Sequence, residues 1–252
     1  MAHAYDDKFF DWVNLTALRS ARLFLPVVKQ ATDAASVADV GCGQGAWLSV
    51  WREMGVEDVC GLDGDYVARD RLLIPQENFR ATDLAAAFAL DRRFDVAQSL
   101  EVAEHLPPEI SQTLVDCLCK LSDVVVFSAA QPGQGGEQHI NERRISWWAA
   151  RFAAQGYAAF DCLRPELAQE TDVSPWYRFN AVVYANAAGQ ARLSPDALKT
   201  RCDDLARLDI SGDLAWKLRM AVLRPLPVQV VSWLSRLNYR IACARQARSQ
   251  AA

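Results

Sequence analysis

The sequence predicts an α/β fold: a doubly wound, mostly parallel sheet of seven strands, followed by a C-terminal helical extension. Short apolar runs alternate with helical patterns from residue 37 to residue 185, which is typical of a parallel sheet with helices on both faces. The first apolar run breaks into glycines and then opens a helix, as in nucleotide-binding sheets. Beyond residue 193 only helical patterns remain.

The chain divides into three predicted parts: a leading helix in residues 1–30, a sheet domain in 31–190 and a helical extension in 191–252. The predicted strands are 37–40, 58–62, 79–82, 94–100, 123–128, 157–163 and 179–185. The predicted helices are 9–29, 46–54, 66–72, 109–121, 145–155, 195–208 and 212–223. Ser194 and Pro195 form a typical helix start, which marks the beginning of the extension.

Composition indicates a globular chain of 252 residues with ample material for a core, since 51% of the residues are hydrophobic and 23% are charged. No apolar stretch approaches the ~20 residues that a membrane span needs. The polar start, with Asp6 and Asp7, predicts no signal peptide. The seven cysteines form no C-x-x-C pair, so we expect reduced thiols and a cytoplasmic location.

The net charge of −4 is unevenly distributed. From Trp216 onward the chain carries seven basic residues and no acidic ones, whereas residues 1–215 carry 20 basic and 31 acidic residues. We call residues 1–215 the body of the chain. Because this body is acidic, the sequence argues against binding of long nucleic acid.

A candidate cofactor loop follows the first strand, where Gly41, Gly43 and Gly45 allow a tight turn and close backbone approach to a ligand. Asp63 ends the second strand, 18 residues after Gly45. A doubly wound sheet places a carboxylate there to accept hydrogen bonds from ribose hydroxyls. With Asp39 ahead of the glycines, the loop reads D-x-G-x-G-x-G and departs from the G-x-G-x-x-G pattern of dinucleotide-binding enzymes.

This loop resembles motif I of the class I S-adenosylmethionine-dependent methyltransferases, and the resemblance extends from about Phe10 to Asn186. It implies a Rossmann-like fold with S-adenosylmethionine as cofactor. Asp39 and the glycines would hold the methionine end, Asp63 the ribose and Asp83 the adenine amino group. The implied cofactor site comprises Asp39, Gly41, Gly43, Gly45, Asp63, Asp83, Leu84, Ser99 and Leu100. The leading helix would be a partial lid over this site or a helix packed on the sheet.

A candidate metal site follows the fourth strand. One helical turn would bring Glu101, Glu104 and His105 onto one face at i, i+3 and i+4. Two carboxylates and an imidazole suit a divalent cation, with Mg²⁺ or Mn²⁺ preferred. His139, just past the neighbouring fifth strand, would complete the set of ligands. The alternative is that this Glu-x-x-Glu-His segment serves packing and cofactor contacts.

The E-x-x-E-H pattern with a later histidine resembles metal-dependent O-methyltransferases, including ubiquinone-pathway catechol-type enzymes and small-RNA 3′-end 2′-O-methyltransferases. The resemblance implies that the metal coordinates two vicinal oxygens of the acceptor. The segment 133–136 with His139 and Asn141, together with residues 176–180, also resembles bacterial methyltransferases of glycan and specialised-metabolite biosynthesis. The aromatic residues of 176–180 would form an acceptor wall or part of the core.

These observations predict an S-adenosylmethionine-dependent O-methyltransferase acting on a hydroxyl of a small molecule or glycan, with a sugar-like vicinal diol preferred. His139, His105 and Glu104 are the predicted catalytic residues. One alternative is a metal-free enzyme that uses His139 as base on a phenol. An RNA terminus is disfavoured by the acidic body. The other alternative, a cofactor-binding protein without chemistry, is disfavoured by the intact polar positions of the motifs.

The basic tail from Trp216 onward has three open interpretations. It carries a predicted apolar stripe of Val230, Trp233 or Leu234, Leu237, Ile241 and Ala244. The stripe would pack on the acidic body, form a homodimer interface, or attach the chain peripherally to the inner membrane surface.

Overall fold

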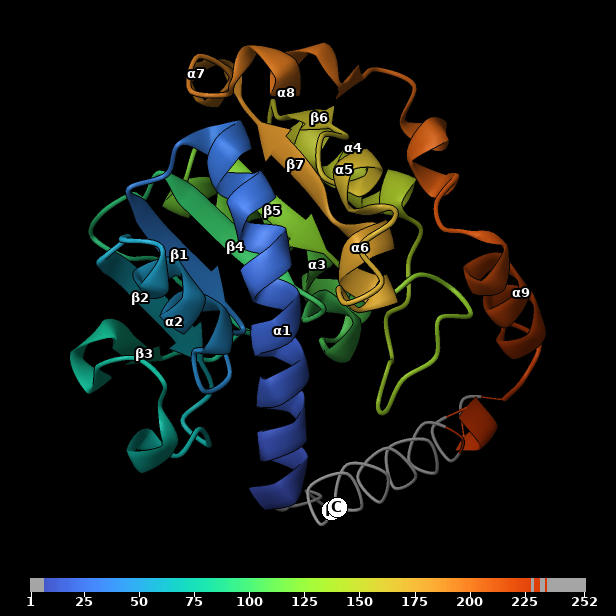
Figure 1. The fold of residues 1–252 in the computed structure, drawn as a ribbon, viewed down its shortest axis with the longest axis horizontal. Coiled ribbons are helices and arrows are strands. Elements are labelled where there is room, and N and C mark those ends of the chain that lie inside the picture. Colours follow the sequence, from blue (N-terminus) through green and yellow to red (C-terminus); the bar gives the residue numbers. More distant parts are fainter. Residues whose placement is uncertain (1–6, 228, 232–233, 235–252) are drawn as a thin grey trace.

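The central element is one eight-stranded sheet flanked by helices, seen in a computed structural model that describes residues 7–227, 229–231 and 234 (Figure 1). The strand order is β3-β2-β1-β4-β5-β7-β6-β8. The strands are β1 (Ser36–Val40), β2 (Asp58–Asp63), β3 (Phe79–Ala81), β4 (Val96–Leu100), β5 (Val124–Ser128), β6 (Ala158–Phe160), β7 (Val182–Ala185) and β8 (Arg201–Cys202).

The sheet is parallel from β3 to β5, and β7 inserts antiparallel between β5 and β6. The predicted fold class is confirmed, with one strand more than the seven expected. The order reverses between β1 and β4, so a crevice is expected at the carboxyl ends of these strands. The glycine loop after β1 and the Glu-x-x-Glu-His segment after β4 both lie at this edge.

Helices cover both faces of the sheet, as the alternating pattern predicts. They are α1 (Asp7–Thr32), α2 (Ala46–Glu53), α3 (Ser111–Leu121), α4 (Ile145–Ala154), α5 (Arg164–Leu167), α6 (Pro175–Asn180), α7 (Ala187–Gln190), α8 (Pro195–Lys199) and α9 (Leu214–Leu223). None of the helices in the described ranges is long and apolar enough to cross a membrane.

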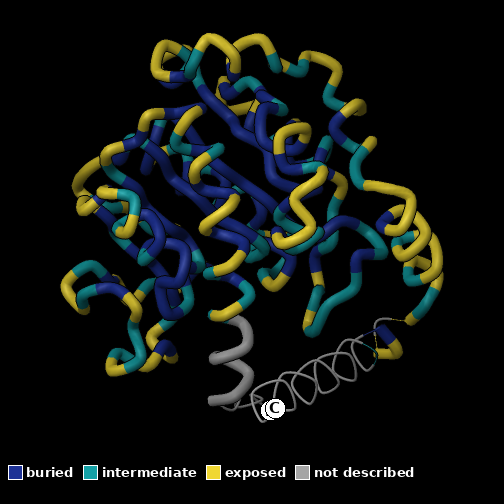
Figure 2. Tube along the Cα trace, viewed as in Figure 1, coloured by how far each residue is buried: buried dark blue, intermediate teal, exposed yellow. Residues whose placement is uncertain are grey.

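Two apolar cores lie on opposite faces of the sheet, because successive residues of a strand point to opposite sides. Val37 and Val96 pack with α1 and α2, whereas Ala38 and Ala97 pack with α3 and α4. Figure 1 shows α1 crossing the front of the sheet, and Figure 2 shows that the central strands are buried along their length.

The extension differs from the helix predicted for residues 195–208. Helix α8 ends at Lys199, and the chain then runs beside β6 as the short strand β8 before a 3₁₀ helix at Leu205–Asp209. The amide of Asp161 donates to the carbonyl of Thr200, so pairing with the sheet edge prevails over helix continuation. The helix predicted at 66–72 is only a 3₁₀ turn, Arg69–Arg71. Trp233, Leu237, Ile241 and Ala244 of the predicted stripe lie outside the described residues.

Candidate active site

The glycine loop folds tightly against β2. The amides of Gly41 and Cys42 both donate to the carbonyl of Leu62, at 2.8 and 3.3 Å. Gly41 has φ +84°, and a Cβ there would lie 2.3 Å from a methyl of Val102, so this position leaves no room for a side chain. Gly43 has φ +54°, yet a Cβ there would meet no atom within 4 Å. The backbone at Gly43 therefore borders open space where a ligand can approach it.

Asp63 anchors this loop from the end of β2. Its Oδ2 accepts a hydrogen bond from the amide of Gly43, and its Oδ1 accepts one from the amide of Gly64, each at 2.7 Å. The hydroxyl of Tyr66, an exposed residue, donates to the same Oδ1 at 2.5 Å. Asp63 is thus a buried carboxylate that faces the open space at Gly43 and already binds one hydroxyl group.

Asp39 lies deeper in the site, buried near the end of β1 beside Gln98 of β4. Burial raises its pKa to about 7. Neither its Oδ2 nor the hydroxyl oxygen of the buried Ser99 has a hydrogen-bond partner among the described residues. Buried polar groups without partners indicate a place for a ligand, so Asp39 and Ser99 fit the cofactor site predicted from the sequence.

The remaining predicted cofactor residues surround this region less closely. Asp83 is exposed beyond β3, where its carboxylate accepts a hydrogen bond from the amide of Ala85 at 2.9 Å. Leu84 and Leu100 are buried in the cores on the two faces of the sheet. Helix α1 reaches the loop through Asn14, whose side chain donates to Gln44 at 2.6 Å.

Glu101 does not share the helical turn that the sequence predicts. It has φ +58°, and the 3₁₀ helix begins only at Ala103. The Glu101 carboxylate accepts hydrogen bonds from Gln134 at 2.6 Å and from Asn180 at 3.2 Å. Burial raises its pKa, and these hydrogen bonds partly oppose the rise.

Glu104, His105 and His139 converge in front of Glu101. One ligand atom from each lies within 4.8 Å of the others, and the two imidazole rings meet edge to face at 4.9 Å. The backbone carbonyl of Glu104 accepts hydrogen bonds from the amides of Ile140 and Asn141, which fixes the loop that carries His139. Three of the four predicted metal ligands therefore form one cluster, with Glu101 beside it.

The electrostatics of the cluster suit a bound cation. Both carboxylate oxygens of Glu104 are buried with no hydrogen-bond partner among the described residues. Burial, and then the charge of Glu101, raise the pKa of Glu104 well above its ordinary value. Desolvation by the surrounding protein, and then the charge of His139, lower the pKa of His105 to about 4. The residue as a whole is nevertheless exposed at the surface. This donor set fits a divalent cation, which favours the charged carboxylate and the neutral imidazole.

An amide network behind the cluster was not predicted. Asn180, at the end of α6, donates to Gln134 at 2.7 Å and accepts from Gln131 at 2.9 Å. Glu142 was also missed, and its carboxylate lies 3.1 Å from Nδ1 of His139. The sequence could have indicated Glu142, because a carboxylate only three residues after His139 is close enough in the chain to contact its imidazole. No local pattern pairs Asn180 with Glu101, 79 residues away.

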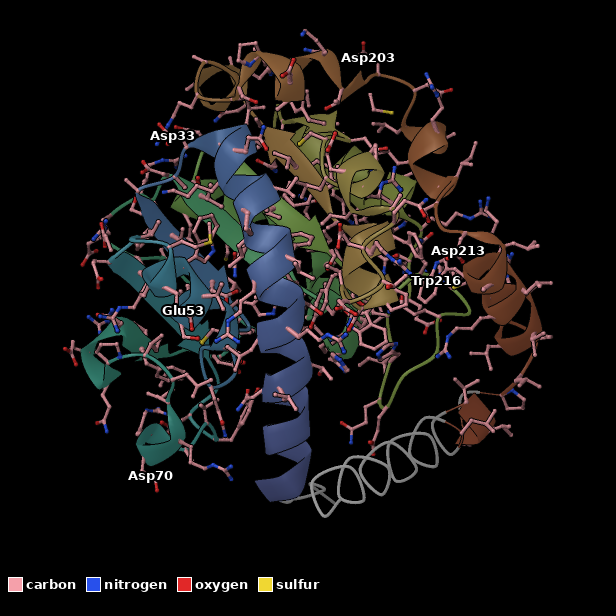
Figure 3. The ribbon with its side chains drawn as sticks, viewed as in Figure 1. Asp33, Glu53, Asp70, Asp203, Asp213 and Trp216 are labelled. Atoms are coloured by element: carbon pink, nitrogen blue, oxygen red, sulfur yellow. The ribbon has the colours of Figure 1, made fainter. Side chains whose placement is uncertain are left out.

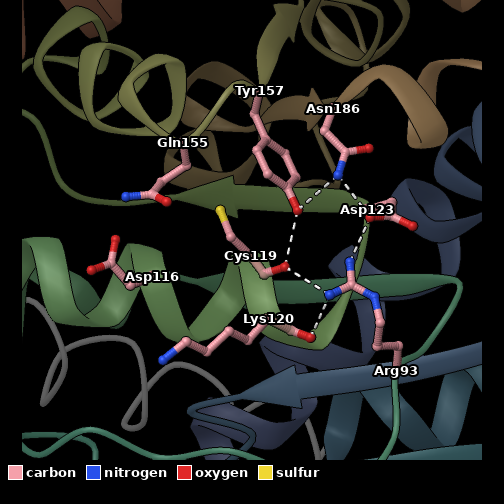
Figure 4. Close-up of a pocket in the computed structure, with 8 residues that line it drawn as sticks. All are labelled: Arg93, Asp116, Cys119, Lys120, Asp123, Gln155, Tyr157 and Asn186. Atoms are coloured by element: carbon pink, nitrogen blue, oxygen red, sulfur yellow. Dashed lines mark hydrogen bonds and ion pairs between the residues drawn. The ribbon is translucent and has the colours of Figure 1, made fainter.

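A surface cavity of about 410 Å³ lies at the opposite edge of the sheet, at the amino ends of β4 and β5 (Figure 4). Its lining residues are Arg93, Asp116, Cys119, Lys120, Asp123, Gln155, Tyr157 and Asn186. Arg93 and Asn186 donate to Asp123, and the Tyr157 hydroxyl lies 2.7 Å from the carbonyl of Ser122. The polar groups of this cavity hydrogen-bond to neighbouring protein groups, and they lie far from the glycine loop and the Glu-x-x-Glu-His segment. The cavity is therefore not part of the candidate active site.

The fold and the glycine loop define a class of protein: an α/β chain with a glycine-rich turn at the carboxyl edge of its sheet, where this kind of fold binds nucleotide-type cofactors. Residues 5–163 match the sequence family described as "Methyltransferase domain". The chain belongs to this family and is an S-adenosylmethionine-dependent methyltransferase. No protein of curated function matches it.

Several solved structures are similar to this chain. The methyltransferase domain of bacterial CtHen1-C is 24% identical, with TM-score 0.50 over 67% of this chain and 98% of that one. DesVI from Streptomyces venezuelae is 24% identical, with TM-score 0.41, and the match covers 48% of this chain and only 56% of DesVI. Magnesium protoporphyrin IX methyltransferase from Synechocystis PCC 6803, with bound S-adenosylmethionine, is 15% identical, with TM-score 0.47 over 74% and 87% of the two chains.

Gly43→Ala is expected to weaken S-adenosylmethionine binding, because the new methyl group enters the open space beside the loop. Gly55→Ala is the matched control, since Gly55 also has positive φ and an unobstructed Cβ direction but lies after α2, outside the site. Both variants should lose about 1 kcal/mol of stability from the left-handed backbone. Calorimetry should find weaker binding only for Gly43→Ala, and equal affinity in the two variants would contradict the assignment.

Asp39 predicts a pH dependence of stability in the cofactor-free protein. Its pKa is raised to about 7 in the folded chain from about 4 in the unfolded chain, so between these values the folded chain holds the extra proton. Its contribution to the free energy of unfolding therefore falls as the pH rises through this window. Urea unfolding should find that Asp39→Asn gains stability relative to wild type from pH 4 to 7, and no further above that. A difference independent of pH would show that the pKa of Asp39 is not raised in the folded chain.

Proposed function

We propose that this methyltransferase transfers its methyl group to a hydroxyl oxygen of a small molecule or glycan, with the help of a divalent cation. A sugar-like vicinal diol is the preferred acceptor. The observation that carries the proposal is the convergence of Glu104, His105 and His139 within 4.8 Å at the cofactor edge of the sheet. The excess of acidic residues in the body disfavours a nucleic-acid acceptor, because its phosphates would be repelled.

The cofactor side of the site would be built from the strand ends. Asp63 would accept hydrogen bonds from the ribose hydroxyls, taking over the role that the Tyr66 hydroxyl has in the free chain. Asp39 and the loop at Gly43 would hold the methionine end. Helix α1, linked to the loop by Asn14 and Gln44, would cover the cofactor as a partial lid.

The acceptor side would be built from the 3₁₀ helix and the loop after β5. Glu104, His105 and His139 would hold Mg²⁺ or Mn²⁺, with Glu101 beside them, and the cation would act as Lewis acid and template for the acceptor hydroxyl. Glu101 is itself held by Gln134 and Asn180, which fixes its carboxylate next to the cluster. Orienting the hydroxyl toward the methyl donor would supply much of the rate enhancement.

The test is metal analysis of protein purified without a histidine tag, combined with methyl transfer to model diols and phenols. We expect bound Mg²⁺ or Mn²⁺, loss of activity in excess chelator, and recovery when metal is added. S-adenosylmethionine affinity, measured by calorimetry in the same chelator, should persist. Full activity without metal would reject the cation.

A second candidate function is favoured by Glu142. Its carboxylate lies 3.1 Å from Nδ1 of His139, an arrangement that orients an imidazole as a general base. In this alternative His139 removes the proton of a phenolic hydroxyl without metal. Glu142→Gln separates the two functions: activity that resists chelator but falls in Glu142→Gln would select the metal-free base.

A further inference from the structure

Helix α9 has an inner face that packs against the catalytic body. Trp216 is buried and its ring meets Phe179 of α6 at 5.8 Å; Figure 3 shows this residue on the side of α9 nearest α6. The guanidinium of Arg219 donates to the backbone carbonyl of Gln134. A Cβ at Gly133 would lie 2.7 Å from the carbonyl oxygen of Met220, so the helix touches the loop itself. Helix α9 therefore packs directly on the loop that leads to His139.

The outer face of α9 is an apolar stripe without a partner in the described residues. Leu214, Leu218 and Val222 follow one another at i, i+4 and i+8, and their exposed fractions are 73%, 57% and 64%. Ile210, just before the helix, is 74% exposed. We call these four residues the outer stripe. Figure 2 shows α9 exposed over most of its length at the margin of the molecule.

Basic side chains border the outer stripe, and no acidic residue follows Asp213 in the sequence. With 3.6 residues per turn, Lys217 lies along one border of the stripe and Arg219 along the other, although the Arg219 guanidinium turns inward to Gln134. Arg224 follows the helix, with its Cα and Cβ against the loop at Gly133. All three basic residues are exposed, and an apolar helical face beside exposed basic residues is a feature of helices that lie in the headgroup region of a membrane.

We propose that the outer stripe docks on an anionic lipid bilayer, with α9 lying in the plane of the surface. A second copy of the chain is the less favoured occupant, because α9 carries Lys217 and Arg219 and no acidic residue, so pairing two copies of this helix would bring like charges together. Anionic lipid supplies both the apolar phase for the stripe and the opposite charge for the basic residues beside it. The proposal does not depend on which hydroxyl is methylated.

The docked helix would keep its inner face on the loop at Gly133. The loop that leads to His139 would therefore lie next to the lipid surface while the acidic body remains in solution. Docking would place the acceptor side of the molecule, rather than the opposite sheet edge, toward the membrane.

Vesicle co-sedimentation of the full chain tests the proposal. We expect sedimentation with phosphatidylcholine vesicles that contain about one third phosphatidylglycerol, none with pure phosphatidylcholine, and release between about 0.05 and 0.5 M salt. The variant Leu214→Ser/Leu218→Ser/Val222→Ser should bind at least tenfold more weakly, and Lys217→Gln/Arg224→Gln should also bind less.

A matched control replaces three exposed leucines elsewhere, Leu15→Ser/Leu73→Ser/Leu198→Ser, and should bind as wild type does. Unaltered methyl transfer by the stripe variant in vesicle-free solution would show that it is folded. A wild-type chain that stays in the supernatant at low salt, or a stripe variant that sediments fully, overturns the proposal. So does light scattering that finds a dimer in wild type and a monomer in the stripe variant, which assigns the stripe to self-association.

Discussion

Asp63→Ala is expected to weaken S-adenosylmethionine binding at least tenfold and to abolish methyl transfer at low cofactor concentration. Hydrogen bonds to a carboxylate contribute about 1.5–3 kcal/mol each, so the loss of even one bond to a ribose hydroxyl gives this factor. Calorimetry on the folded variant measures it.

The control must share the structural role of Asp63, because that carboxylate also holds the amides of Gly43 and Gly64. Asp95 offers the match: at the opposite edge of the sheet its carboxylate accepts hydrogen bonds from the amides of Ala35 and Ser36, at 2.9 and 3.0 Å. Asp95→Ala should lose comparable stability and retain cofactor affinity. If both variants bind the cofactor as wild type does, Asp63 is not a cofactor ligand.

Glu104→Gln should reduce methyl transfer by at least about 100-fold and remove the bound divalent cation, as expected for the loss of a charged metal ligand. Glutamine preserves the shape of the side chain, so the fold and the affinity for S-adenosylmethionine should be unchanged. The measurements are metal content and turnover at saturating cofactor.

Glu109→Gln is the control for this variant, since it neutralises an exposed carboxylate in the same connection between β4 and α3 and should leave activity intact. Glu104→Gln with full metal content would remove Glu104 from the set of ligands. Wild-type activity in a metal-free Glu104→Gln protein would favour His139 acting with Glu142.

The first half of the fold can be predicted from the sequence because each strand and turn is marked by residues that lie close together in the chain. The short apolar runs before Gly41 and Asp63 are bounded by turn residues, which favours strands over helices, and the parallel order places their polar ends at one edge. Glu104, His105 and His139 converge as expected because β4 and β5 are neighbours.

Other features depend on contacts that no local pattern contains. The left-handed backbone of Glu101 removes that residue from the predicted helical turn, yet hydrogen bonds from Gln134 and Asn180 keep its carboxylate beside the cluster. The helix predicted at 195–208 gives way to β8, since the free edge of β6 competes for the same backbone groups. Tertiary pairing overrides helix propensity at that point.

The contact between α9 and the loop before His139 sets the order in which the two halves of the site can form in a nascent chain. Chains generally fold from the N-terminus as they leave the ribosome. The strands that carry Asp39, Asp63 and Ser99 are complete by residue 100, whereas the loop before His139 is held by Asn180 and Arg219. The cofactor half can therefore form early in synthesis, and the acceptor half is assembled only when α6 and α9 have emerged.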